Sequence, residues 1–394
     1  MNLLFVTPTP PFPPRNGAEL MVANLARGLA SRHTLTLATL TAPPVVKTPQ
    51  PYFQKAYFFA QSIAPRWRKW AYSFFDALPL WARVGASAEL RAALPEIATR
   101  ENIHVAHLDT GIMAQYADAL ARTPTALAAH DVLTPQLQAR ARRASDWRLR
   151  LLLRAQTPKM REYETRFYAR ATRVCVVTER ERAALQALDA ALSARVIPNG
   201  VDTVYFAPQA TPVLSDSIGF LGAMDYAPNQ AAALYFAKTI LPRIAREQPN
   251  ARFTVIGRNP SAEIRALTRD SRIRVSGTVD DVRPLVAAHS IMVAPMLDAG
   301  GMKFKTLEIL ALAKVLVATP AALEGIAARD GIELLVAQDA NEFTKTCVEI
   351  LRDETRRRAL EKNARAWALR HDWTNTVAQY EALYQEARDA FAVR

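Results

Sequence analysis

The 394-residue chain has only two cysteines, Cys175 and Cys347, far apart in the sequence. This spacing excludes a disulfide-stapled scaffold or a metal knuckle and favours a reducing compartment. No apolar run reaches the roughly 18 residues that span a bilayer, and the apolar start at residues 1–6 ends in a proline-rich turn, unlike a signal peptide. We therefore expect a cytoplasmic protein, or one held peripherally on the inner face of the plasma membrane.

The sequence also lacks the motifs of several common enzyme classes. It has no complete G-x-G-x-x-G and no G-x-x-x-x-G-K-[ST], which argues against a dinucleotide dehydrogenase and a P-loop NTPase. Only six histidines occur, in no zinc-binding pattern, and the nucleophile elbow G-x-S-x-G is missing. We therefore expect no metal and no cofactor, with the chemistry carried by residues at loop-to-helix junctions.

Positive charge is unevenly distributed along the chain. The formal net charge is +13, and between Arg140 and Arg173 eleven basic residues face three acidic ones. A smaller patch, residues 66–70, places tryptophans beside cations. Two interpretations remain open: a solvated helix face, or an anionic membrane surface to which each basic residue contributes on the order of 1 kcal/mol. No nucleic-acid module accompanies the charge, so we expect no nucleic-acid partner.

Hydrophobic patterning predicts two domains of alternating strands and helices. An apolar strand at residues 3–6, a helical pattern at 19–31 and a second strand at 34–40 form a βαβ unit. The pattern restarts after residue 202, with a strand at 217–221. We therefore expect an α/β chain of two Rossmann-like, doubly wound domains, residues 1–205 and 206–375. In this architecture the carboxyl ends of the strands face a central cleft that binds ligands.

The most informative segment is residues 295–308, which joins a predicted strand to a predicted helix. Gly300 and Gly301 allow the backbone to approach a ligand closely. Lys303 and Lys305 add two cations where helix amides also favour an anion, such as a diphosphate. Glu308, one turn into the helix, can accept two hydrogen bonds from a vicinal diol.

This segment resembles the donor-binding motif of family 4 retaining glycosyltransferases, in the branch that carries Gly-Gly-x-Arg-x-Lys-x-Leu-Glu. One such match is weak, but six in the right order over nearly the whole chain are specific. Residues 195–202 resemble the family's interdomain I-P-N-G-V-D, and residues 222–229 resemble the opening of its second domain. Residues 255–258 resemble a strand end, and residues 277–281 and 324–325 resemble two later turns.

The resemblance implies a GT-B fold. Residues 1–205 would bind the acceptor, 206–375 the nucleotide-sugar, and 376–394 would form a helix crossing back to the first domain. It implies catalytic roles for His130, which contacts the transferred sugar, for Lys305 at the diphosphate and for Glu308 at the ribose. The donor-binding residues implied are Gly17, Gly222, Arg258, Val279, Gly300, Gly301, Lys303, Lys305, Thr306, Leu307 and Glu308.

The implied reaction is metal-independent, retaining transfer of a hexose-type sugar from a nucleotide-sugar donor to a glycan or lipid-linked acceptor, such as a cell-surface polysaccharide intermediate. Four residues depart from the family pattern: Gly300 replaces an acidic residue, Lys303 an arginine, and Ala313 and Val315 a glycine and a proline. Two alternatives remain open. One is a non-catalytic partner of another transferase that binds nucleotide-sugar or membrane; the other is a GT-B nucleotide-sugar epimerase.

Overall fold

A computed structural model of the chain describes residues 1–43, 45, 47–61, 78–297 and 304–393. The chain divides into two compact units. Unit 1 contains Met1–Pro198 and Thr376–Arg394, and unit 2 contains Asn199–Asn375. The division after Pro198 falls a little before residue 205, within the segment that resembles the interdomain motif.

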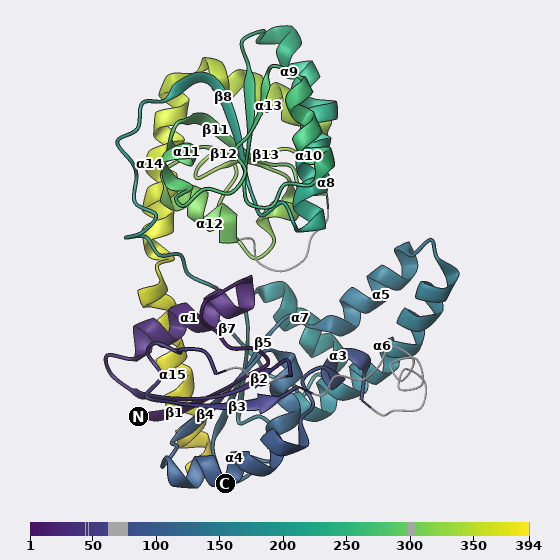
Figure 1. Cartoon of the computed structure of the whole chain (residues 1–394), viewed down its shortest axis with the longest axis vertical. Helices are drawn as coiled ribbons and strands as arrows, with labels where there is room; N and C mark the ends of the chain where they lie inside the picture. Colours follow the sequence, from purple (N-terminus) through teal and green to yellow (C-terminus); the bar gives the residue numbers. More distant parts are fainter. Residues whose placement is uncertain (44, 46, 62–77, 298–303, 394) are drawn as a thin grey trace. The chain divides into compact units, whose positions relative to one another are not determined.

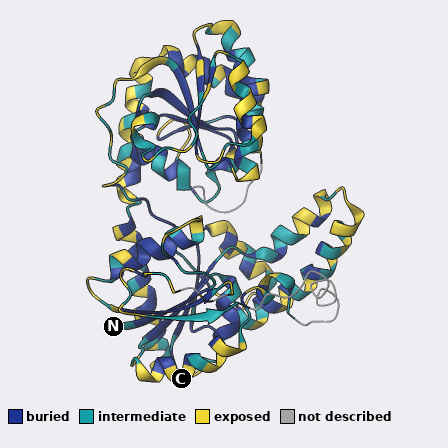
Figure 2. Cartoon of the chain, viewed as in Figure 1, coloured by how far each residue is buried: buried dark blue, intermediate teal, exposed yellow. Residues whose placement is uncertain are grey.

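Unit 1 is built on a parallel sheet of seven strands, in the order β3-β2-β1-β4-β5-β6-β7. Strands β1, β4 and β5 are buried almost throughout, as expected of a parallel sheet covered by helices on both faces. Figure 2 shows the strands in the dark blue of buried residues and the exposed residues on the outer faces of the helices. The strands are β1 (Asn2–Thr7), β2 (Thr34–Thr41), β3 (Lys55–Ala60), β4 (Val105–Asp109), β5 (Thr125–His130), β6 (Arg173–Val176) and β7 (Arg195–Val196).

The helices of unit 1 include two that form a hairpin, α5 and α6, which runs away from the sheet (Figure 1). The chain from Thr376 onward packs on unit 1 through α15, where Tyr380 and Tyr384 are buried. The helices are α1 (Gly17–Leu29), α3 (Leu80–Arg83), α4 (Ala88–Arg100), η1 (Gly111–Tyr116), α5 (Leu133–Arg143), α6 (Trp147–Tyr168), α7 (Glu179–Leu188) and α15 (Trp373–Ala392).

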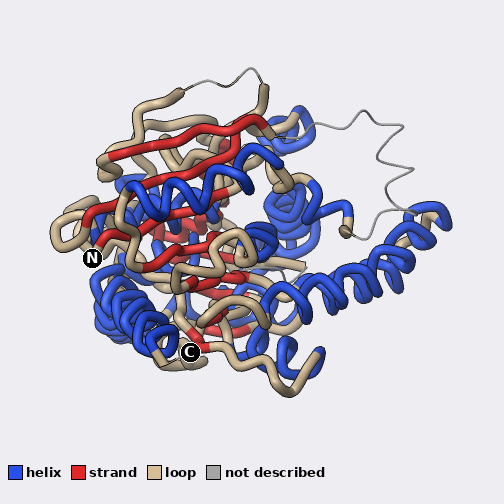
Figure 3. The backbone as a smooth tube through the Cα atoms, turned by 90° about the horizontal axis from the view of Figure 1, so that it is seen from below, coloured by secondary structure: helices blue, strands red, loops and turns tan. Residues whose placement is uncertain are grey.

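Unit 2 has a second parallel sheet, in the order β10-β9-β8-β11-β12-β13. Its chain begins at β8, winds outward to β10 and then returns to β11 on the other side of β8, so β8 and β11 flank a topological switch point. Figure 3 shows the whole chain from below, with strands in red and helices in blue. The strands are β8 (Leu214–Leu221), β9 (Arg252–Ile256), β10 (Ile273–Val275), β11 (His289–Ala294), β12 (Leu316–Ala318) and β13 (Leu335–Val336).

Helices connect these strands and bury their apolar faces against the sheet. In α13, for example, Phe343, Cys347 and Ile350 recur at helical spacing and are all fully buried. The helices are α8 (Ala227–Tyr235), η2 (Phe236–Ile240), α9 (Leu241–Glu247), α10 (Ala262–Ala266), η3 (Leu267–Arg269), α11 (Arg283–Ala287), α12 (Phe304–Ala311), η4 (Pro320–Leu323), α13 and α14, the last two spanning Ala340–Arg352 and Glu354–Arg370.

Candidate functional site

Helix α12 carries the described part of the expected donor site in unit 2. Gly300, Gly301 and Lys303 lie outside the described residues, which resume at Phe304, where α12 begins. Lys305 and Glu308 are three residues apart and therefore neighbours on one face of the helix. Both are partly buried, at the end of the sheet where the carboxyl ends of β8 and β11 lie.

The ammonium group of Lys305 is held by side chains from three other segments. Its Nζ donates to Asn229 Oδ1 at 2.6 Å and lies 3.2 Å from Met296 Sδ. It also lies 4.7 Å from the ring centroid of Phe220, which gives a favourable cation–π contact. Asn229 belongs to α8 and Phe220 to β8, so packing fixes this cation at the sheet edge.

Glu308 combines a carboxyl group with an environment that disfavours its charge. Burial raises the pKa of Glu308 to about 7, and the nearby Lys305 charge only partly offsets that effect. The group therefore changes its protonation near neutral pH. When ionised, its two oxygens can accept hydrogen bonds from both hydroxyls of a vicinal diol.

Gly222 and Gly257 end the neighbouring strands β8 and β9 and are required by close packing. A Cβ at Gly222 would lie 2.8 Å from Nδ2 of Asn229, and one at Gly257 would lie 1.8 Å from the carbonyl oxygen of Gly222. Asn229 in turn donates from Nδ2 to the carbonyl oxygen of Ala223 at 2.9 Å. Gly222 therefore leaves room for the residue that holds Lys305. Our sequence reasoning gave Asn229 no role, although it closes the matched segment 222–229.

Two other expected donor residues lie on loops at the carboxyl ends of β9 and β10. Arg258 is about half exposed, with Nε 3.7 Å from Oδ2 of Asp225, so it forms a weak surface ion pair. Val279 is partly buried in the loop after β10. Gly277, near the start of the same loop, has a φ of +68°. At that φ a glycine is favoured on backbone grounds alone.

Thr306 and Leu307 were expected in the donor site, but their side chains lie in the core. Thr306 is fully buried and its Oγ1 donates to the carbonyl oxygen of Ala322 at 3.2 Å, while Leu307 packs in the apolar cluster of unit 2. These side chains anchor α12, so only their main-chain atoms remain as a route to a ligand. Ala313, which departs from the family glycine, keeps the left-handed backbone that a glycine would favour, with a φ of +56°.

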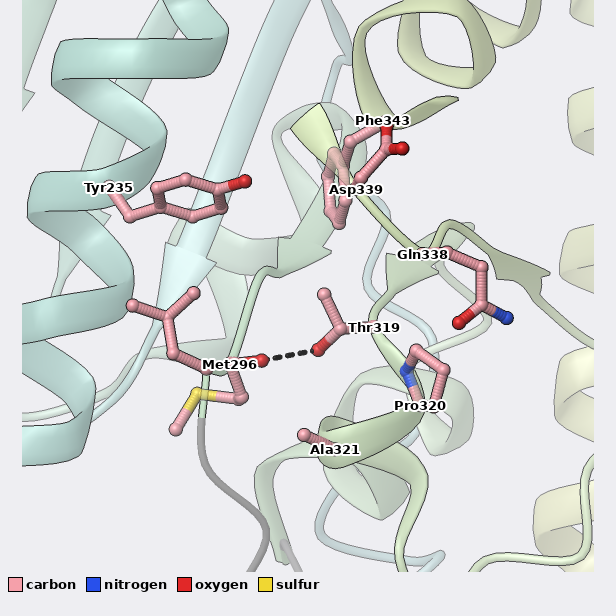
Figure 4. A pocket seen from close by; sticks show the side chains of 9 residues that line it. Tyr235, Met296, Thr319, Pro320, Ala321, Gln338, Asp339 and Phe343 are labelled. Atoms are coloured by element: carbon pink, nitrogen blue, oxygen red, sulfur yellow. Dashed lines mark hydrogen bonds between the residues drawn. The ribbon is translucent and has the colours of Figure 1, made fainter. Parts of the chain in front are cut away.

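A cavity of about 270 Å³ lies at the carboxyl ends of β11, β12 and β13 (Figure 4). Oγ1 of Thr319 donates across its floor to the carbonyl oxygen of Met296 at 2.7 Å. Asp339 brings a carboxylate, which caps α13 by accepting from the amides of Asn341 and Glu342. Because that carboxylate repels an anion, the cavity does not match a diphosphate site. It is lined by Tyr235, Met296, Leu297, Thr319, Pro320, Ala321, Gln338, Asp339 and Phe343.

In unit 1, His130 ends β5 in an unusual backbone conformation. Its φ is +59°, and the register between β5 and β6 shifts between Ala128 and His130, as at a β-bulge. Nε2 of His130 lies 2.9 Å from Oδ1 of Asp109, a buried carboxylate at the end of β4. Burial lowers the pKa of His130, but Asp109 outweighs that effect and the net pKa is raised.

The segment that follows His130 is held by two buried carboxylates. Oε2 of Glu181 accepts from the amide of Val132 at 2.5 Å, and Glu164 accepts from the amide of Leu133 at 2.6 Å. Burial raises the pKa of Glu164 to about 7. Sequence reasoning assigned no role to Asp109, Glu164 and Glu181. Of the three, only Asp109 carried a signal of its role, because it is a charged residue at the end of an otherwise apolar strand.

Gly17 begins α1 and is exposed. The preceding Asn16 caps the helix by accepting from the amide of Glu19 at 3.0 Å, and Glu19 accepts from the amide of Arg15 at 2.7 Å. This cap places Gly17 in the first turn of the helix, where the dipole favours a negative charge.

Within the described ranges, no three His, Cys, Asp or Glu residues are grouped so that they could hold a metal ion. The same part of the chain contains no helix of the length and apolarity needed to cross a membrane.

Two doubly wound α/β units, each with its polar residues at the carboxyl edge of a parallel sheet, define the GT-B class, as predicted. The structure is similar to sucrose-phosphate synthase from Thermosynechococcus elongatus, with a TM-score of 0.72 and 16% identity over 100% of both chains. It is also similar to HepE from Anabaena in complex with UDP, with a TM-score of 0.70 and 15% identity over 98% of this chain and 100% of that one.

Two family models match the sequence: Glycosyltransferase Family 4 over residues 15–205 and Glycosyl transferases group 1 over residues 215–353. The chain belongs to this family of glycosyltransferases, which confirms the family predicted from the sequence; its Gly-Gly branch stays a prediction. A curated relative, the phosphatidyl-myo-inositol mannosyltransferase of Mycolicibacterium smegmatis, is 28% identical over 204 residues, 49% of this chain. The match spans 52%, about half, of that relative's length.

Proposed function

We propose that this protein is a retaining glycosyltransferase that moves a sugar from a nucleotide-sugar donor to an acceptor hydroxyl. The observation that carries the proposal is the pairing of Lys305 and Glu308 on one face of α12, at the sheet edge beside the switch point. An ammonium group suits a diphosphate, and a carboxylate suits the diol of a ribose. The HepE structures with UDP and with UDP-glucose support a donor of this chemistry.

In the proposed reaction the sugar–phosphate bond breaks and the nucleoside diphosphate leaves with the bonding electrons. The acceptor oxygen attacks from the face the diphosphate leaves, and a diphosphate oxygen takes its proton, so no protein base is needed. Lys305, together with Lys303 and helix amides, balances the charge that develops on the leaving group. This is the reason we propose a metal-independent reaction. His130 contacts the transferred sugar.

A thermal-shift screen of UDP, GDP, ADP, CMP and dTDP tests the donor site. A nucleotide at 100 times its dissociation constant stabilises the native state by about 2.7 kcal/mol, enough to move the melting temperature by a few degrees. We expect one nucleotide to stabilise the native protein and Glu308→Ala and Lys305→Ala to abolish the shift. Lys345→Ala and Glu349→Ala, which remove the same charges from an exposed pair on α13, should preserve it.

The alternatives predict different products from the nucleotide-sugar that binds. A transferase slowly hydrolyses its donor without acceptor and speeds up when acceptor is added. A non-catalytic partner protein binds the nucleotide without turnover, and an epimerase converts the donor to its epimer. If no nucleotide stabilises the native protein, the proposed donor site is wrong.

We also propose a lipid-linked or cell-surface glycan acceptor, with an anionic membrane surface bound through residues 140–173. The tip of the α5–α6 hairpin supports this, because Trp147 and Leu151 are 65% and 51% exposed and lie one helical turn apart. An aromatic and an aliphatic side chain among cations are typical of an interfacial anchor. The exposed arginines around them are Arg140, Arg142, Arg143, Arg148 and Arg154.

Co-sedimentation with vesicles tests this surface. We expect the protein to bind vesicles of phosphatidylcholine that contain roughly 30% phosphatidylglycerol, the anionic content of a charged leaflet, and not to bind vesicles of pure phosphatidylcholine. Arg142→Glu with Arg143→Glu should release it, whereas reversing two exposed charges of α14, Arg356 and Lys362, should not. Equal binding to both vesicle types, or no binding, would refute the proposal without affecting the donor site.

A further inference from the structure

A line of buried polar groups in unit 1 connects His130 to the C-terminal helix. Asp109 Oδ1 lies 2.9 Å from Nε2 of His130 and 3.8 Å from Nε2 of His107. The other nitrogen of the His107 ring, Nδ1, lies 2.9 Å from the hydroxyl of Tyr384 in α15. His107, Asp109 and Tyr384 are all at most 2% exposed. Three of the four polar groups are therefore shielded from water, and His130, whose side chain is 15% exposed, forms the outer end of the line.

The donors and acceptors of this line fix the position of the proton on His107. Burial lowers the pKa of His107, so the ring is neutral and carries one proton. An ionised carboxylate only accepts hydrogen bonds, whereas a tyrosine hydroxyl can donate. With Tyr384 as the donor, Nδ1 of His107 accepts and the proton lies on Nε2, which faces Asp109 at 3.8 Å and makes no hydrogen bond. Burial acts to raise the pKa of Asp109, but the two histidines together lower it, so the carboxylate stays ionised.

The backbone at both strand ends is strained. Thr110, which follows Asp109, has a φ of +66°, and His130 has a φ of +59°. Non-glycine residues adopt such angles at an energetic cost and keep them only where the surroundings hold them in place. Here Asp109 holds the side chain of His130, and Glu181 and Glu164 hold the amides of Val132 and Leu133 just after it.

We propose that Asp109 is a positioning residue for His130. It keeps the proton of the His130 ring on Nε2 and so presents Nδ1 to a bound molecule, while His107 and Tyr384 keep Asp109 in place. The part that concerns the transferred sugar rests on the proposed function, because His130 contacts that sugar only if the protein is a transferase. The ring orientation and its proton do not depend on the reaction, so they can be tested separately.

Several other groups face this line and bear on its titration. Asp131 adds negative charge beside His130, and the Cys175 thiol and the Tyr380 hydroxyl, 3.6 Å apart, lie near Asp109. Burial raises the pKa of Cys175 to about 12 and that of Tyr380 well above its ordinary value, so both stay neutral at physiological pH. Of the two acidic residues beside His130, Asp109 forms the hydrogen bond to the ring, so replacing Asp109 should change the pKa of His130.

Nitrogen-15 NMR of the full chain with labelled histidine tests the proposal directly. His130→Gln assigns the His130 signals, and the shifts of its two ring nitrogens report which one carries the proton. At a pH above the raised pKa of His130 we expect the neutral Nε2–H form in the native protein, and Asp109→Asn should lower that pKa and mix the two neutral forms. Glu381→Gln is the matched control, because it removes the carboxylate 2.7 Å from His33 and should change the His33 signals alone.

An Nδ1–H form in the native protein, or an unchanged His130 spectrum in Asp109→Asn, would overturn the proposal. The first result is decisive even if Asp109→Asn fails to fold. Turnover of UDP-glucose and of GDP-mannose supplies a second readout. With the donor that the native protein turns over, Asp109→Asn should lower kcat about 10- to 100-fold with little change in KM, the effect of losing a hydrogen bond to a charged group. Asp109→Glu should recover part of the lost kcat. If the native protein turns over neither compound while NMR shows the Nε2–H form, the proposed function is in question and the positioning role stands.

Discussion

Nucleotide binding should become weaker as the pH falls through 7, because Glu308 must be ionised to accept hydrogen bonds from a ribose diol. Burial raises the pKa of Glu308 to about 7. A proton and the ligand then compete for the same carboxylate, and affinity falls in proportion to the ionised fraction. Between pH 8 and pH 6 this fraction changes about tenfold, whereas a glutamate of ordinary pKa would stay ionised throughout.

The terminal phosphate of a nucleoside diphosphate titrates near pH 6 as well, so the affinity of one nucleotide cannot isolate Glu308. The matching 2′-deoxynucleotide solves this problem, since it keeps the phosphates and lacks the diol. We therefore expect the ratio of UDP to dUDP affinity, measured by titration calorimetry, to rise about tenfold from pH 6 to pH 8. If the thermal-shift screen selects another base, its own pair replaces UDP and dUDP.

Glu308→Gln is the control, because it keeps the size of the side chain and removes its titration. In that variant the ratio should be small and independent of pH. A ratio that stays constant in the native protein would refute the reasoning, since it would mean either that Glu308 does not contact the diol or that its charge is not disfavoured. A ratio that depends on pH equally in both proteins would assign the effect to another group.

Three further predictions follow from single contacts. Gly257→Ala should lower the stability of unit 2 by about 1–3 kcal/mol or more, since its Cβ would lie 1.8 Å from a backbone oxygen. Gly277→Ala meets no neighbouring atom and carries only the backbone strain of a φ of +68°, so it should cost less, and urea unfolding compares the two variants. Glu164 has a pKa raised to about 7, so it contributes stability that is fully present below its unfolded pKa of 4.5 and is lost as the pH rises through 7. The free energy of unfolding, measured between pH 5 and pH 8, should therefore depend less on pH in Glu164→Gln than in the native protein. Lys305→Met should weaken UDP binding about 10- to 100-fold and leave uridine binding nearly unchanged, as calorimetry can show.

The sequence predicted the two α/β units because apolar strands, helical periodicity and turn glycines agree along most of the chain. It also predicted that Lys305 and Glu308 lie on one face of a helix, since they are close in sequence and their spacing is a helical one; their role in binding the donor stays a prediction. For Gly222, Thr306 and Leu307 the structure adds a packing role that the sequence did not reveal. A motif records every residue that a segment needs, and packing around a site needs particular residues as much as binding does.

The partners of the functional side chains could not be predicted in this way. Asp109 meets His130 because β4 and β5 are adjacent in the sheet, and Tyr384 reaches His107 from α15, 277 positions further along the chain. Asn229 reaches Lys305 across 76 positions. Each of these contacts depends on which strands lie side by side, and hydrophobic patterning does not specify strand order.

Strand order nevertheless provides one rule that locates the candidate site in each unit separately. In unit 2 the first strand, β8, is followed in space by β11, and the segment leaving β11 leads to α12 with Lys305 and Glu308. In unit 1 the first strand, β1, is followed in space by β4, and β4 ends at Asp109. Both sites therefore begin at the carboxyl end of the strand just beyond the switch point, where the diverging connections leave the sheet edge open. Applied to unit 1 as it was to unit 2, this rule singles out the end of β4, and the charged residue there is Asp109.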